Sequence, residues 1–165
     1  MALRAGKVLL VFAVAIFYSF VVFNNLTDYN SNYQFVRHVL MMDSTFPGNR
    51  GMWRAIDLPL WHTAFYLSII ALEAITMALC WWGAFHLTHA LQKPAQEFHR
   101  AKRVAILALT ISLLTWLVVF LSVGGEWFLM WQSKTWNGQD AAFRMFAIEG
   151  IVLLLLALPD SENQP

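Results

Sequence analysis

Four long apolar stretches make up most of this chain, at residues 8–23, 60–90, 104–131 and 141–158. A helix needs about 20 mostly apolar residues to cross a hydrocarbon core that is about 30 Å thick. Hydrophobic residues make up 59% of the chain and charged residues only 13%, whereas about 25% of the residues of a soluble domain are charged. The sequence therefore predicts an all-α membrane protein, a bundle of four transmembrane helices.

We expect one transmembrane domain that occupies residues 1–165, with spans at about 6–24, 60–90, 104–131 and 139–158. The loop between the first two spans, 25–59, is the longest. It contains an apolar stripe with helical period, at Tyr33, Phe35, Val36, Val39, Leu40 and Met42. Such a stripe predicts a short amphipathic helix at the outer, periplasmic membrane surface. We expect this helix to dock a partner through Tyr33, Phe35, Val36, Arg37, His38 and Leu40.

The basic residues predict the orientation. Six of them lie before the first span and between the second and third spans, at Arg4, Lys7, Lys93, Arg100, Lys102 and Arg103. Positive charge marks the cytoplasmic side of a membrane protein. Both termini are therefore expected in the cytoplasm, and the first and third loops outside. The acidic tail 160–165 is expected to be loose.

Two acids, Glu73 and Glu149, lie near mid-bilayer depth in the second and fourth spans. Counting along the helices places both about 12–14 Å from the inner boundary. Ionisable residues at this depth are expensive and commonly functional. We expect the two carboxyls to lie at one depth and to share a proton. The candidate polar site combines them with neighbours at that level or on the same helix face, namely Glu73, Glu149, His62, Tyr66, Ser112 and Thr115.

Several kinds of chemistry are disfavoured. The single cysteine, Cys80, excludes an internal disulfide and every multi-cysteine metal site. The histidines of the spans, His62, His86 and His89, all lie on the second span, whereas membrane haem usually takes ligands from two helices. The sequence contains no catalytic motif, and a net charge of +1 gives no basic surface for nucleic acid. We therefore predict no catalytic residue, no metal and no resident cofactor.

One part of the chain is unusually specific. The run at 24–43, Pro47, the stretch 52–56, and His62, Tyr66 and Glu73 together resemble an uncharacterised bacterial family of predicted small integral membrane proteins, a domain of unknown function. The resemblance covers essentially the whole chain. It implies a bacterial inner membrane, with the outer face periplasmic, and it implies no activity, cofactor or catalytic residue.

Three functions remain open. The leading expectation is a non-enzymatic accessory or assembly subunit of a larger inner-membrane complex, with the lipid bilayer and other membrane subunits or a second copy as partners. The second is a proton- or ion-conducting module that uses Glu73 and Glu149. The third is a membrane subunit of a redox complex that binds a quinone or a lipid. Hydrogen bonds that only hold the bundle together would also explain the polar layer.

Overall fold

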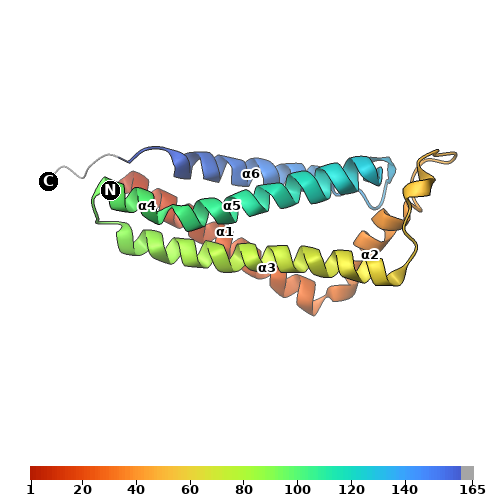
Figure 1. The fold of residues 1–165 in the computed structure, drawn as a ribbon, viewed down its shortest axis with the longest axis horizontal. Coiled ribbons are helices and arrows are strands. Elements are labelled where there is room, and N and C mark those ends of the chain that lie inside the picture. The colour runs from red at the N-terminus through yellow and green to blue at the C-terminus, as the bar shows by residue number, and fades with distance from the viewer. Residues whose placement is uncertain (161–165) are drawn as a thin grey trace.

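The computed structural model describes residues 1–160, and within them it is all helical. The longest helical segments lie side by side as rods (Figure 1), namely α1 (Ala2–Thr27), α3 (Pro59–Ala90), α5 (Arg103–Leu114) continued by η2 (Thr115–Trp127), and α6 (Gln139–Ala157). The rods form a closed ring, because α1 packs against α3, α3 against α5, α5 and η2 against α6, and α6 against α1. The start of α1 and the end of α6 lie at the same end of the bundle.

Three helical segments are long and apolar enough to cross a membrane, at Ala2–Thr27, Pro59–Ala90 and Ala95–Trp127. The third includes the short helix α4 (Ala95–Ala101), which precedes α5. Helix α6 has 19 residues and carries Asp140, Arg144 and Glu149, so its apolar surface is more interrupted. The all-helical membrane class predicted from the sequence is thus confirmed, and a fourth crossing by α6 stays a prediction.

Two helix ends differ from the predicted spans. Helix α1 continues to Thr27, so Asn25, which was expected in the loop, lies on a helix and is 5% exposed. The third rod ends at Trp127 and not at 131, because Leu129 adopts a left-handed backbone with φ of 54°. A short 3₁₀ turn, η3 (Met130–Gln132), follows. The polar Asn24-Asn25 pair therefore belongs to the bundle.

Segment η2 is a π-helix, in which each bond spans five residues. The backbone amide of Phe128 donates to the Val123 carbonyl in this way, at 3.0 Å. The side-chain hydroxyl of Ser122 also donates within the segment, to the Leu117 carbonyl at 2.8 Å. Such helices are rare and usually last one turn, often beside a functional site. Here the π-helical segment covers 13 residues and lines the cleft described below.

Helix α2 (Tyr29–Met41) covers one end of the bundle (Figure 1). The helix predicted at 33–42 is present, although it begins earlier and ends where Met42 turns left-handed, with φ of 53°. Its apolar face points inward, since Val39 and Leu40 are buried in a cluster with Phe128 and Met130. A further 3₁₀ turn, η1 (Met52–Arg54), follows in the same loop.

A buried charge cluster closes the opposite end. The Nζ atoms of Lys7 and Lys102 donate to the Leu158 carbonyl, at 2.6 and 2.8 Å, and both lysines form ion pairs with Asp160. Burial raises the pKa of Asp160, but the hydrogen bonds and charges of Lys102 and Lys7 outweigh this effect and lower it below its usual value. Asp160 is therefore held firmly, contrary to the expected loose tail, whose residues 161–165 lie outside the described part of the chain.

Candidate functional site

Glu73 lies at the centre of a hydrogen-bonded cluster that joins three helices. The Asn25 amide on α1 donates from Nδ2 to Glu73 Oε2 on α3 at 2.6 Å. Asn25 Oδ1 accepts two bonds, one from Asn32 Nδ2 on α2 at 2.6 Å and one from the Tyr66 hydroxyl on α3 at 3.1 Å. Glu73, Asn25 and Tyr66 are all buried. The extension of α1 to Thr27 places Asn25 on the buried face of that helix, where it reaches Glu73 on α3.

This cluster lies in the wall of a cleft of about 330 Å³. Its polar lining comes from Asn24, Asn25, Asn32, Tyr66 and Glu73, and its aromatic lining from Phe35, Tyr66, Trp116 and Phe120. Glu73 Oε1 and Asn32 Oδ1 have no hydrogen-bond partner within residues 1–160. Two acceptor atoms are therefore left for an occupant of the cleft.

A narrow apolar slot of about 50 Å³ adjoins the cleft under α2. The slot and the cleft share Phe35, Val36, Ile69 and Phe120 in their walls. Phe35 packs directly on Gly138, because a Cβ at Gly138 would lie 2.9 Å from Phe35 Cζ. The two spaces together offer a polar end and an apolar end.

Glu149 belongs to a second cluster. Ser112 on α5 donates its hydroxyl to Glu149 Oε2 on α6. The Tyr18 hydroxyl lies 2.5 Å from Ser112 Oγ, and because the single Ser112 proton is already engaged, Tyr18 is the donor of that bond. Trp116 Nε1 donates to the Tyr18 hydroxyl at 3.1 Å. The chain of donors thus runs from Trp116 through Tyr18 and Ser112 to Glu149.

The residues of the predicted polar site therefore separate. Glu73 and Tyr66 lie in one cluster and Glu149 and Ser112 in the other, and within the part of the chain that the structure describes no hydrogen bond joins the two carboxyls. Each acid has its own partners, so the structure gives no support to a shared proton.

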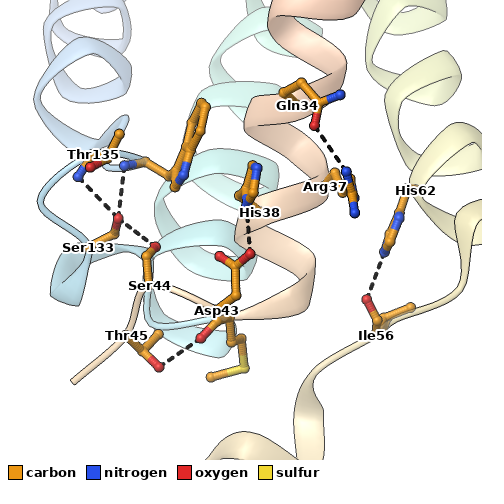
Figure 2. A network of polar contacts seen from close by, with 12 residues as sticks. Gln34, Arg37, His38, Asp43, Ser44, Thr45, Ile56, His62, Ser133 and Thr135 are labelled. Atoms are coloured by element: carbon orange, nitrogen blue, oxygen red, sulfur yellow. Dashed lines mark hydrogen bonds and ion pairs between the residues drawn. The ribbon is translucent and has the colours of Figure 1, made fainter. Parts of the chain in front are cut away.

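His62 and Thr115 belong to neither cluster. His62 Nε2 donates to the Ile56 carbonyl at 2.8 Å (Figure 2). Thr115 Oγ1 donates to the Ile111 carbonyl of its own helix at 3.0 Å. Both side chains satisfy local backbone, as Thr often does inside membrane helices.

The predicted docking face of α2 packs mainly on the protein itself. Tyr33 stacks on Tyr29, with ring centroids 5.7 Å apart, while Phe35 and Val36 line the cleft and Leu40 is buried. Arg37 donates to Gln34 on the same helix (Figure 2).

His38 ties α2 to its surroundings. Its ring stacks on Trp136 at 4.5 Å, and its Nδ1 lies 2.6 Å from Asp43 Oδ2. Next to this pair, Ser44 donates to Ser133 Oγ at 2.7 Å, which joins the loop after α2 to the loop before α6 (Figure 2). These contacts fix α2 over the cleft.

Asn25 and Asn32 are the site residues that sequence reasoning missed. A signal for Asn25 was present, because it continues the buried stripe of α1 through Val11, Tyr18 and Val22 at intervals of three to seven residues. Asn32 gave no such signal, since it is an exposed residue whose partner is reached only when α2 folds back over α1.

Comparison with known proteins identifies a family but no activity. No curated protein matches the chain. No solved structure matches it either. A family model described as "Predicted small integral membrane protein (DUF2165)" matches residues 3–159, which is nearly all of the chain. The protein therefore belongs to this family of small integral membrane proteins, a domain of unknown function.

Proposed function

We propose that this protein is a non-enzymatic accessory subunit of a bacterial inner-membrane complex and that it binds the ammonium head group of an amphiphile in the cleft beside Glu73. The observation that carries the proposal is the cleft of about 330 Å³, which combines a buried carboxyl group with asparagine side chains under a helical cover. A carboxyl group inside a membrane bundle is costly, so its default interpretation is functional.

The lining of the cleft favours a cation. It holds Glu73 and three asparagines, and it includes no lysine, arginine or histidine. An ammonium group has three donors and no acceptor, which suits the unpaired Glu73 Oε1 and Asn32 Oδ1. Trp116 and Tyr66 also line the cleft, and a cation over an aromatic face gains about 0.5–2 kcal/mol. The adjoining apolar slot takes the start of a hydrocarbon chain.

The proposal also includes an orientation in the membrane. Helix α6 is the fourth span, both termini are cytoplasmic, and α2 and the cleft are periplasmic. The six basic residues support this orientation. It is also supported by the position of the start of α1 and the end of α6, which lie at the same end of the bundle. In this frame the cleft opens in the outer leaflet.

A proton-conducting module has less support. A relay from Glu73 to Glu149 needs groups that both accept and donate protons along its length. The Glu149 chain instead begins at Trp116, and the indole N–H only donates. Trp116 therefore blocks transfer from the cleft through these side chains.

Native mass spectrometry of delipidated protein tests the proposal. We expect phosphatidylethanolamine to be retained about tenfold better than phosphatidylglycerol, and Glu73→Gln and Asn32→Leu to abolish the preference. Glu126→Gln is the control, since Glu126 is an exposed acid outside the cleft. Displacement of the lipid by free ethanolamine would identify a soluble amine as the occupant. Equal retention of both lipids, or an unchanged preference in Glu73→Gln, would contradict the proposal.

A further inference from the structure

An arginine lies between two tryptophans where the loop before α3 meets the end of η2. The central carbon of the Arg54 guanidinium, Cζ, lies 5.9 Å from the ring centroid of Trp53 and 5.4 Å from that of Trp127. The two indoles also contact each other edge to face, with centroids 5.7 Å apart. These three side chains form the Arg54 cluster, which joins η1 to the last residue of η2.

Most of the hydrogen-bond donors of Arg54 are unused. Its Nε donates to the Gly51 carbonyl at 3.3 Å. Within residues 1–160 its terminal nitrogens, Nη1 and Nη2, have no hydrogen-bond partner. Arg54 also forms no ion pair in this part of the chain, although Glu126 directly precedes Trp127. A guanidinium whose terminal nitrogens are unpaired offers a planar fork of N–H groups, and this fork matches the oxygens of a phosphate group.

The Arg54 cluster lies at the level of a membrane surface. Two of the segments that can cross a membrane end here, since α3 begins shortly after η1 and η2 ends at Trp127. Figure 1 shows the loop between α2 and α3 at one end of the bundle. Trp61, in the first turn of α3, and Trp81 are about 30 Å apart along the helix, which is the thickness of the hydrocarbon core. Trp61 therefore marks the hydrocarbon boundary, and the cluster lies at the level of the lipid head groups.

Several large rings are exposed at this end of the bundle. Trp53 is 76% exposed and Trp127 is 49% exposed. Phe46 and Trp131, which pack edge to face with centroids 5.7 Å apart, are exposed as well. Tryptophan is enriched at the head-group level of membrane proteins, where its apolar ring meets lipid and its N–H meets polar groups. These rings therefore favour lipid, and not water, as the neighbour of the cluster.

We infer that Arg54 binds the phosphate group of a phospholipid at this membrane surface, while Trp53 and Trp127 contact the glycerol and the upper acyl chains of the same lipid. The charges are complementary, because the guanidinium has no carboxylate partner among the described residues and a phosphodiester is an anion. A free phosphate ion would leave the exposed rings in water, so the lipid is the better occupant. The cluster shares no residue with the cleft or the slot, and its site stands or falls separately from the ammonium site.

Native mass spectrometry of the full chain tests this inference, with phosphatidylglycerol as the probe. This lipid carries the phosphate but no ammonium group, so its retention does not report on the cleft. Digalactosyldiacylglycerol with the same acyl chains is the lipid control, because it lacks the phosphate. We expect Arg54→Gln to weaken the retention of phosphatidylglycerol about tenfold, since it removes charge-assisted hydrogen bonds, and to leave the retention of the galactolipid unchanged. Arg50→Gln is the matched control, because Arg50 is an exposed arginine of the same loop outside the cluster.

Hydrogen exchange in the parent protein locates the site and does not depend on the folding of any variant. In nanodiscs of phosphatidylglycerol, the backbone amides of residues 50–57 should exchange more slowly than in nanodiscs of the galactolipid. Equal exchange in the two lipids, or retention of phosphatidylglycerol that Arg54→Gln leaves unchanged, would overturn the inference. It would also be overturned by an equal loss in Arg50→Gln, which would show a general effect of charge. Displacement of the lipid by millimolar inorganic phosphate would contradict it too, since the occupant would then be a free anion.

Discussion

At Gly83 the backbones of α3 and α5 lie so close that no side chain fits between them. A Cβ there would lie 2.8 Å from Ala105 N and 2.9 Å from Ala105 Cα. Small residues permit such contacts between membrane helices. We expect Gly83→Ala to lower the free energy of unfolding by about 1–3 kcal/mol, the usual cost of overpacking, measured by thermal denaturation in detergent.

The control for Gly83→Ala is Gly6→Ala, because no atom lies within 4 Å of a Cβ at Gly6. Alanine is the better helix former by up to about 1 kcal/mol, so this variant should be as stable as the parent or slightly more stable. Equal losses in the two variants would show that α3 and α5 are not in close contact.

Asp160 makes the stability of the protein depend on pH. Its pKa is lowered in the folded state by Lys102 and Lys7, so its contribution is present above the unfolded pKa of about 3.9 and is lost as the pH falls through the lower folded value. Asp160→Asn leaves two buried lysines without their counter-ion. Breaking a buried ion pair in this way lowers the free energy of unfolding by about 3–5 kcal/mol. We expect the variant to melt well below the parent at pH 6, with the gap narrowing at acid pH. Identical melting at pH 6 would refute the ion cluster.

At the scale of the element, α2 owes its position to the side chains that it buries. Leu40 lies on the inner face of α2 and is 4% exposed. Its truncation to alanine should lower the free energy of unfolding by about 2–5 kcal/mol. We expect the α2 amides to exchange hydrogen faster in Leu40→Ala while those of α3 stay protected. Leu26→Ala, at a position 63% exposed, should leave α2 unchanged. Unaltered hydrogen exchange in Leu40→Ala would mean that other contacts hold α2 in place.

The sequence predicted elements better than it predicted their partners. Helical period and length located the four rods and α2, because both signals are local. The burial of Glu73 and Glu149 followed from their depth, and Ser112 was correctly placed at the level of Glu149. Part of the predicted docking face of α2 packs on the bundle, through Leu40 and its neighbours. An amphipathic stripe indicates that a face is buried, but it does not indicate which surface buries it, so docking of a partner stays a prediction.

Long-range pairing explains what the sequence did not show. Lys7 and Lys102 were used only to predict the cytoplasmic side, and nothing in the sequence indicated that both are buried and bind Asp160, more than 50 residues away from either in the chain. Asn32 reaches Asn25 only because α2 folds back over the end of α1. Neither contact leaves a periodic signal, so each requires the assembled fold.

For the whole molecule, the orientation in the membrane is the next prediction. The basic segment from the α3–α4 loop to the start of α5 and the end of α6 lie at one end of the bundle, and positive charge favours the cytoplasm. Reporter fusions at Gln92 and after residue 165 should therefore both give cytoplasmic signals. A periplasmic signal at Gln92 would invert the protein and place the cleft in the inner leaflet, and one at the C-terminus alone would remove α6 as a span.

The central claim is that the cleft beside Glu73 holds an ammonium head group. A crystal structure of the protein grown in a lipidic mesophase that contains phosphatidylethanolamine tests it most directly. The account predicts a head group in the cleft, with its nitrogen within hydrogen-bond distance of Glu73 Oε1 and Asn32 Oδ1, and with its chain toward the slot lined by Phe35 and Phe120. A cleft closed by its own side chains, or one that holds only an acyl chain with no polar contact to Glu73, would contradict it.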